Sequence, residues 1–169
     1  MKKNVKPAEV IQDLQFFGEF GGVNPSIADS STFTYLAGKT MGDVFEGNRE
    51  GCYLYSRHTN PSTSYLGQAI AQMEGMSGAI LTSSGMAAIT ATILQICSSG
   101  DEIVSSRTIY GGTYAFMKNY LPRFGIKTTF VDSTNLEEIK DSITSKTKMI
   151  YCESMSNPLL EVIDIKSIS

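Results

Sequence analysis

The residues best suited to binding chemistry stand where a predicted strand meets a predicted helix. Residues 79–82 form a short apolar run expected to be a strand, and residues 86–97 repeat apolar side chains at helical spacing. Between them stands Ser84-Gly85-Met86, where a helix start would expose unpaired N–H groups and partial positive charge. The junction therefore predicts a phosphate site, although an ordinary helix cap is the simpler alternative. Neither G-x-G-x-x-G nor a Walker loop is present, which argues against dinucleotides and ATP.

Two more polar segments follow predicted strands. Tyr110 stands beside two glycines, where its ring could lie flat over a planar ligand. Glu153-x-x-x-Asn157-Pro158 comes later, and the proline favours an extended Asn157 whose amide could reach a ligand oxygen. A tyrosine that closes a loop and ordinary turn chemistry are the alternatives.

Tyr55-Ser56-Arg57 is a third kind of candidate, because arginine makes forked, charge-assisted contacts with phosphate. A surface arginine is the alternative. The single histidine, His58, is expected in a loop, and one histidine excludes most catalytic zinc sites. The cysteines are odd in number and far apart, which argues against disulfides and fits a reducing cytoplasm. They are Cys52, Cys97 and Cys152.

The elements that must position these residues alternate between short apolar strands and helices. Further strands are expected at 102–105, 128–131 and 148–152, and further helices at about 66–73, 113–121 and 135–143. This alternation predicts an α/β fold with a mostly parallel sheet and helices on both faces. Ligands of such sheets bind beyond the carboxyl ends of the strands, where the polar segments stand. Residues 162–169 resemble the start of a further helix, so the chain is expected to stop mid-element.

Residues 1–60 differ from the remainder. They are rich in Gly, Asn, Ser and Thr, lack a sustained period and yet carry many aromatic side chains, which predicts an N-terminal arm ordered against another surface. Residues 61–169 are expected to begin the main domain. The net charge of −3 offers no basic surface to nucleic acid. No apolar run reaches the roughly 18 residues of a membrane span.

The order and spacing of the motifs are more specific than any one of them. They run Tyr55-Ser-Arg57…Asn60-Pro61, Ser84-Gly85-Met86-Ala-Ala, Gly100-Asp101-Glu102, Tyr110-Gly-Gly-Thr113 and Glu153-x-x-x-Asn157-Pro158. Over residues 50–169 this series resembles the N-terminal part of the cystathionine γ-synthase/methionine γ-lyase family. These are the pyridoxal 5'-phosphate (PLP) enzymes of Cys and Met metabolism.

The resemblance implies a fold and a cofactor. The fold is the large domain of fold-type I PLP-dependent transferases, incomplete here and preceded by the arm. Ser84, Gly85 and Met86 are thereby expected to bind the phosphate of PLP. Tyr110 is expected over the pyridine ring, where it also helps proton transfer near the leaving group.

Further roles follow from the same resemblance. Asn157 is expected near the 3′ oxygen of the ring, with Glu153 close by. Tyr55 and Arg57 are expected to reach the phosphate of a neighbouring subunit. A homodimer or homotetramer joined through the arm is therefore expected, located in the cytoplasm and acting on an amino-acid substrate.

The implied reaction is γ-elimination or γ-replacement at Cγ of homoserine-, cystathionine- or methionine-type substrates. Gly112 stands where methionine γ-lyases commonly carry Cys, which weakens that assignment. Cystathionine γ-synthase, cystathionine γ-lyase, methionine γ-lyase and O-acetylhomoserine sulfhydrylase all stay open.

The covalent anchor of the family is missing. Its S-x-T-K lysine stands downstream of the Asn-Pro pair, after an Asp that pairs with the ring nitrogen, and this chain has neither there. Ser145-Lys146-Thr147-Lys148 spells S-x-T-K, but it precedes Glu153 and leads into a predicted strand, so a surface turn is expected. The chain alone is therefore predicted to be inactive. A non-catalytic α/β phosphate-binding module and a dimerisation partner that lends Tyr55 and Arg57 are the alternatives.

Overall fold

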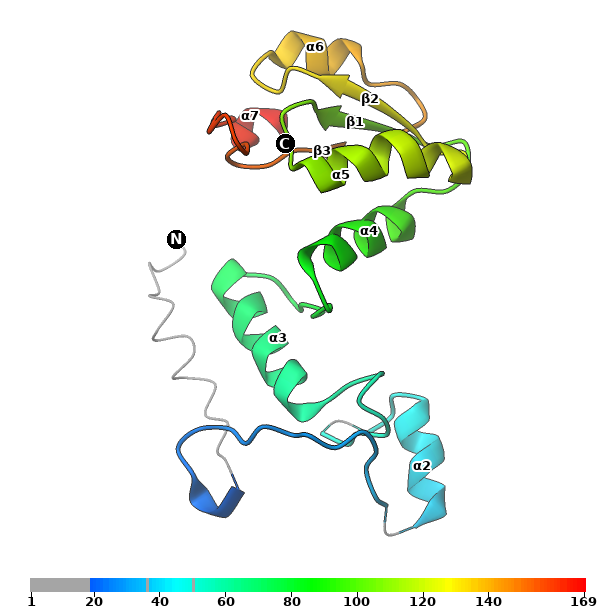
Figure 1. Cartoon of the computed structure of the whole chain (residues 1–169). Coiled ribbons are helices and arrows are strands. Elements are labelled where there is room, and N and C mark those ends of the chain that lie inside the picture. Colours follow the sequence, from blue (N-terminus) through cyan, green and yellow to red (C-terminus); the bar gives the residue numbers. More distant parts are fainter. Residues whose placement is uncertain (1–18, 36, 50) are drawn as a thin grey trace. The chain divides into compact units, whose positions relative to one another are not determined.

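A computed structural model describes residues 19–35, 37–49 and 51–169 (Figure 1). It divides into two compact units, residues 1–81 and residues 82–169. Residues 1–18, 36 and 50 of the predicted arm lie outside the described residues. The predicted boundary between arm and domain at residue 60 stays a prediction.

The described part of the first unit is poor in regular structure before residue 60. It contains the single turn η1 (Glu19–Gly21) and the helix α2 (Gly38–Phe45). The sequence analysis did not anticipate α2, whose segment contains two glycines and so has low helix propensity. An antiparallel bridge between Thr32 and Tyr55 joins the two irregular stretches.

The helix α3 (Pro61–Glu74) ends the first unit. Its cap is Asn60, whose side chain accepts from the N–H of Ser62, so the helix begins earlier than the predicted residue 66. Gly75 ends the helix, because its φ of 67° is a left-handed conformation that glycine adopts without strain.

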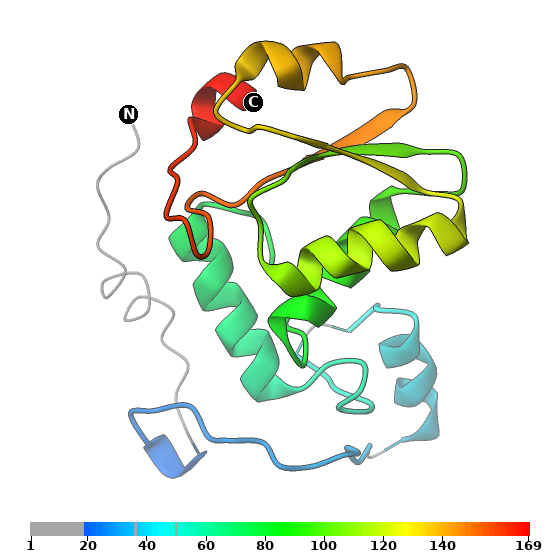
Figure 2. The same ribbon diagram turned by 45° about the horizontal axis from the view of Figure 1, so that its top comes forward.

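The second unit is a parallel sheet with helices on both faces (Figures 1 and 2). Its elements follow in chain order. They are α4 (Gly85–Ile96), β1 (Glu102–Ser106), α5 (Gly111–Ala115), the π-helical turn η2 (Phe116–Tyr120), the 3₁₀ turn η3 (Leu121–Phe124), β2 (Lys127–Val131), α6 (Leu136–Asp141), β3 (Thr147–Tyr151) and α7 (Ile165–Ile168).

The strand order is β2-β1-β3, and both pairings are parallel. Val104 of the central strand pairs with Thr129 on one side and Ile150 on the other. Three of the four predicted strands are thus confirmed. The strand predicted at 79–82 is wrong, because these residues join no ladder and Ile80 is 91% exposed.

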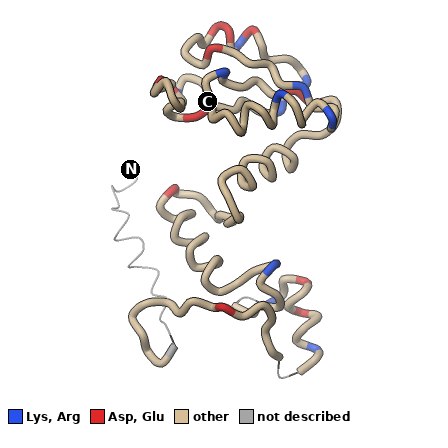
Figure 3. Tube along the Cα trace, viewed as in Figure 1, with Lys and Arg blue, Asp and Glu red and all other residues tan. Residues whose placement is uncertain are grey.

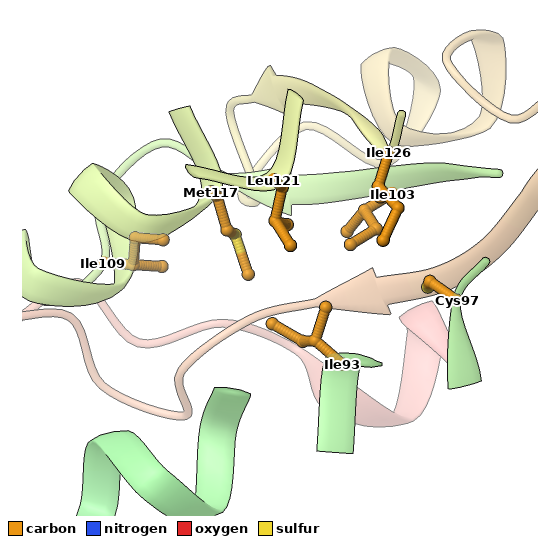
Figure 4. Packing of buried hydrophobic residues seen from close by; sticks show 7 residues of the cluster. All are labelled: Ile93, Cys97, Ile103, Ile109, Met117, Leu121 and Ile126. Atoms are coloured by element: carbon orange, nitrogen blue, oxygen red, sulfur yellow. The ribbon is translucent and has the colours of Figure 1, made fainter. Parts of the chain in front are cut away.

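The main core lies on the face of the sheet toward which Ile103 points. Figure 4 shows side chains from α4, β1, η2 and the following turn converging there. They are Ile93, Cys97, Ile103, Ile109, Met117, Leu121 and Ile126. Because successive residues of a strand alternate in direction, Val104 points to the opposite face and packs with Val131 and Ile139.

The segment predicted as one helix over 113–121 is wound in three ways. It begins earlier, at Gly111, and the N–H of Leu121 then donates to the carbonyl of Phe116, five residues back. The winding also continues past the predicted end at residue 121, because Pro122 lies inside the 3₁₀ turn η3. Among the described residues, no helix has the length and apolar character needed to cross a membrane.

Candidate functional site

The start of α4 is the candidate anion seat, because it has the free N–H groups that anion binding requires. Ser84 is extended, with φ −164° and ψ 162°, and its Oγ accepts from the N–H of Ala87 at 3.1 Å. The N–H groups of Gly85 and Met86 have no acceptor among the residues that the structure describes. An added Cβ at Gly85 would meet no atom within 4 Å, so this approach to the backbone is open.

Charge also favours an anion at this seat. Figure 3 shows that α4 carries neither acidic nor basic residues along its length. Its helix dipole therefore places uncompensated partial positive charge at Gly85. The helix has 12 residues, enough for the dipole to develop fully at its first turn. The predicted phosphate residues Ser84, Gly85 and Met86 thus lie together at a chemically suitable place.

A buried hydroxyl connects this seat to the rest of the unit. Thr113 of α5 is fully buried, and its Oγ1 lies 3.7 Å from the Sδ of Met86, to which it donates. Tyr151, the last residue of β3, also has its phenol within the influence of the Thr113 hydroxyl. Burial raises the pKa of the Tyr151 phenol, and the Thr113 hydroxyl acts in the opposite direction. The three residues join α4, α5 and β3 immediately behind the anion seat.

Tyr110 lies on the loop that follows β1, at the carboxyl edge of the sheet. Its backbone N–H donates to Oε1 of Glu153 at 2.9 Å, and Glu153 lies on the loop that follows β3. The structure thus brings two of the predicted site residues into direct contact. The Tyr110 side chain is 53% exposed, so its ring is accessible to a ligand.

The position of the Tyr110 ring depends on Gly112. An added Cβ at Gly112 would stand 2.5 Å from Cε1 of Tyr110, closer than two non-bonded carbons approach. The ring therefore occupies the space that a side chain at position 112 would take. Glycine at this position is what allows the ring to lie over the first turn of α5.

Asn157 lies at the tip of a tight hairpin after β3. Met155 and Val162 form an antiparallel bridge at its base, and the N–H of Ser156 donates to the carbonyl of Glu161 at 2.9 Å. The bond between Asn157 and Pro158 is cis. Asn157 is exposed, and its side-chain amide has no partner among the described residues.

Lys148 stands away from these loops. It is the second residue of β3, whose first residue pairs with the first residue of β1 at the amino edge of the sheet. Burial raises the pKa of the Cys97 thiol, on which the charges of Asp101 and Lys148 also act. Cys97 follows the carboxyl end of α4, about 18 Å from the start of that helix at Gly85. Lys148, whose charge acts on Cys97, therefore lies toward the end of α4 opposite the anion seat, which supports its rejection as a covalent anchor.

Tyr55 and Arg57 belong to the first unit and lie together there. The guanidinium carbon of Arg57 stands 4.7 Å from the centroid of the Tyr55 ring, within cation–π distance. Arg57 has no carboxylate at ion-pair distance among the described residues. Its charge is therefore available to an anion. His58 is exposed in the same turn, as expected of a loop residue.

The cysteines are free, with Cys97 buried and Cys52 exposed. In the part of the chain that the structure describes, no three His, Cys, Asp or Glu side chains gather as metal ligands would. Sequence reasoning missed the connection between Thr113 and Tyr151. A polar residue at an apolar position of a predicted helix was the available signal, but its partner is known only once α5 is packed on the sheet.

The sequence of the chain matches a known enzyme family. A family model described as Cys/Met metabolism PLP-dependent enzyme matches residues 9–169. A methionine gamma-lyase of Arabidopsis thaliana is 43% identical over 169 residues, which cover 96% of this chain and 38% of that protein. The chain thus spans well under half the length of this relative.

Two solved structures extend the likeness to the fold. A putative O-acetylhomoserine (thiol)-lyase of Campylobacter jejuni, which contains a pyridoxyl-lysine monophosphate, matches with a TM-score of 0.89 at 30% identity. This match covers 98% of this chain and 41% of that one. A cystathionine gamma-lyase of Lactobacillus plantarum in complex with L-serine matches with a TM-score of 0.83 at 31% identity, covering 97% of this chain and 41% of that one. The predicted fold is thereby confirmed.

Proposed function

Since the family model covers residues 9–169, the chain belongs to the Cys/Met metabolism PLP-dependent enzymes, and from this premise we propose what the whole protein does. It is a PLP-dependent lyase or transferase of sulfur amino-acid metabolism, working in the cytoplasm. It catalyses γ-elimination or γ-replacement on homoserine-, cystathionine- or methionine-type substrates. The proposal spans both reactions because the relatives named above include lyases and a thiol-lyase that uses O-acetylhomoserine.

The observation that carries the proposal is the start of α4. A phosphate monoester is a dianion that needs several donors and positive potential. The free N–H groups of Gly85 and Met86 supply the donors, and the uncompensated helix dipole supplies the potential. Ser84 Oγ accepts from Ala87 and still has its own proton to donate. This donor set fits the phosphate of PLP.

The two loops at the carboxyl edge of the sheet fit the ring of the cofactor. Tyr110 offers an exposed aromatic face for stacking, and Asn157 offers an amide without a partner for the 3′ oxygen. Glu153, which accepts a hydrogen bond from the backbone N–H of Tyr110, would lie near the pyridine ring of the cofactor. The two loops therefore supply the contacts to the cofactor ring, whereas the start of α4 supplies the contacts to its phosphate.

When bound, PLP withdraws electron density from Cα of an amino-acid substrate and so eases removal of the neighbouring protons. The residues of this chain bind and orient the cofactor. The α4 seat fixes the phosphate, and the Tyr110 ring excludes water from one face of the pyridine. The Tyr110 phenol is the group that holds or moves a proton near the leaving group at Cγ. Tyr110 is the catalytic residue of this part of the enzyme.

The remaining contributions come from outside these loops. Tyr55 and Arg57 contact the phosphate bound by a neighbouring subunit, so the active enzyme is a homodimer or homotetramer joined through the arm. Lys148, at the far edge of the sheet, does not serve as the covalent anchor. This chain alone therefore catalyses neither reaction.

Titration of the 169-residue chain with PLP and with pyridoxal tests the phosphate seat. Gly85→Pro removes one N–H while keeping the helix, because proline suits the first helical position and Ser84 is already extended. Loss of a hydrogen bond to a charged group is worth about 1.5–3 kcal/mol, so the Kd for PLP is expected to rise at least about tenfold.

Gly42→Ala is the matched control. It alters a helical glycine whose added methyl group also meets no atom within 4 Å but which lies in α2, outside the seat, so the PLP affinity is expected to be unchanged. Pyridoxal, which lacks the phosphate, is expected to bind weakly to all three proteins. Equal binding of pyridoxal and PLP to the unaltered chain would overturn the assignment of the seat.

A further inference from the structure

Asn60 makes more contacts than its position as a helix cap requires. It precedes α3, and its side-chain Oδ1 accepts from the N–H of Ser62 at 2.9 Å. Its Nδ2 donates to the carbonyl of Ala28 and to Oγ of Ser56, each at 3.0 Å. The residue is only 8% exposed. A buried amide with both ends engaged is a fixed point in a unit that otherwise has little core.

The two donated bonds distinguish Asn60 from an ordinary cap. Capping needs only an acceptor, and aspartate caps about as well as asparagine. A side-chain carboxylate has no N–H to give to the Ala28 carbonyl. The amide of Asn60 therefore serves a second purpose, which is to tie two irregular segments to the start of α3.

One of those segments carries the Tyr55–Arg57 pair. Ser56 stands between the two residues, and besides accepting from Asn60 its N–H donates to the carbonyl of Ser31 at 2.9 Å. The N–H groups of His58 and Thr59 both donate to the carbonyl of Tyr55, at 2.8 and 3.1 Å, which closes a single turn. The turn folds the Arg57 guanidinium back over the Tyr55 ring.

We propose that Asn60 is the positioning residue of this pair. Through Ser56 it holds the turn in which Arg57 stacks on Tyr55, so that the pair is assembled within its own chain before any phosphate arrives. Stacking on the ring face leaves the edge N–H groups of the guanidinium free for a forked contact with a phosphate monoester. Preassembly reduces the conformational entropy lost on binding. The phosphate role of the pair rests on the proposed function, whereas its assembly by Asn60 does not.

Nuclear magnetic resonance of the full 169-residue chain can report the assembly directly. A guanidinium 4.7 Å from a ring centroid places the Arg57 side-chain protons in the ring current of Tyr55, which shifts them upfield. Tyr55→Leu is expected to abolish this shift and Arg57→Lys identifies its signals. Asn60→Asp keeps the cap acceptor but removes both donors, and it is expected to lower the shift to less than half.

Asn135→Asp is the matched control. Asn135 caps α6 and its side chain only accepts, from the N–H of Glu138 at 3.2 Å. The same substitution there is expected to leave the Arg57 shift unchanged. An unchanged shift in Asn60→Asp would show that Asn60 is only a cap and would overturn the proposal. If Asn60→Asp fails to fold, Ser56→Ala removes one acceptor of the amide and leaves the cap intact; an unaltered shift in that variant would have the same meaning.

A PLP titration of the same proteins separates this inference from the proposed function. Asn60→Asp is expected to raise the Kd for PLP, though by less than Arg57→Met because Arg57 keeps its charge, while Asn135→Asp leaves the Kd unchanged. If Arg57→Met has no effect on PLP affinity, the phosphate role of the arm is wrong, and the ring-current shift still decides whether Asn60 assembles the pair.

Discussion

The two units of this chain are held together by different interactions. In the second unit, large apolar side chains such as Ile103 and Met117 are fully buried between a sheet and its helices. In the described part of the first unit, the buried apolar side chains are Ala69 and Ala71. Its irregular segments are instead joined by hydrogen bonds that converge on Asn60.

The difference shows what each unit can do alone. Burial of a large apolar side chain stabilises a fold by roughly 1.5–3 kcal/mol, whereas a hydrogen bond contributes about 1 kcal/mol net. The second unit therefore has its own source of stability, whereas the described residues of the first unit leave several apolar side chains uncovered. Val23, Ile27 and Ile80 are each close to fully exposed. This contrast agrees with an arm that is completed by another subunit.

The largest expected effect tests the contrast directly. Ile103→Ala, in the core of the second unit, is expected to lower the free energy of unfolding by about 2–5 kcal/mol, since it removes buried methylenes and leaves a cavity. Ile80→Ala is the same substitution at an exposed position of the first unit, and its expected effect is within about 0.5 kcal/mol. Urea denaturation measures both. Comparable losses of unfolding free energy in the two variants would contradict the difference between the two units.

A smaller effect is expected inside the first unit, at two glycines with opposite surroundings. An added Cβ at Gly67 of α3 would lie 2.9 Å from the carbonyl oxygen of Ala79, so Gly67→Ala forces backbone to move and is expected to cost about 1–3 kcal/mol. Gly42→Ala in α2 meets nothing within 4 Å and is expected to stabilise that helix by about 0.5–1 kcal/mol.

Hydrogen exchange of the α2 and α3 amides measures the two glycine variants separately. Faster exchange in α3 for Gly67→Ala, with slower exchange in α2 for Gly42→Ala, is the expected pattern. Unchanged exchange in α3 would mean that the close contact with Ala79 does not hold the first unit together.

The smallest effect concerns an exposed carboxylate of the second unit. The side-chain and backbone hydrogen bonds from Thr134 hold the pKa of Asp132 below its ordinary value. A depressed pKa in the folded state adds stability above the unfolded pKa of about 3.9, and that stability is lost as pH falls through the folded pKa. Asp132→Asn is therefore expected to lower the urea midpoint slightly at pH 7 and by less at about pH 3, where the carboxylate is partly protonated. An equal difference at both pH values would contradict the assignment.

Much of the second unit could be predicted from sequence because its signals are local. Short apolar runs identified β1, β2 and β3, and Asn135, where a helix was predicted to begin, is the cap of α6. The strand predicted at 79–82 failed because a strand needs a neighbour to pair with its N–H and C=O groups, and apolar character does not supply one. The helix α2 escaped notice because its two glycines give it a weak local signal.

The candidate site was predictable to the extent that single residues define it. Ser84 proved to be the cap of α4. The hydrogen bond between Glu153 and the N–H of Tyr110 joins residues 43 apart, so it exists only after β1 and β3 have paired. The same is true of Asn60, whose donors reach Ala28, 32 residues back. Motif spacing named these residues, but their partners depend on the fold.

The contact between Gly112 and the Tyr110 ring restricts how these two positions can change during evolution. A ring in its present place and a side chain at position 112 exclude each other, so a lineage could not gain one without relocating the other. A side chain at position 112 would displace the ring from the first turn of α5. Positions 110 and 112 are therefore expected to vary together, so that the residue at position 112 predicts the orientation of the Tyr110 ring.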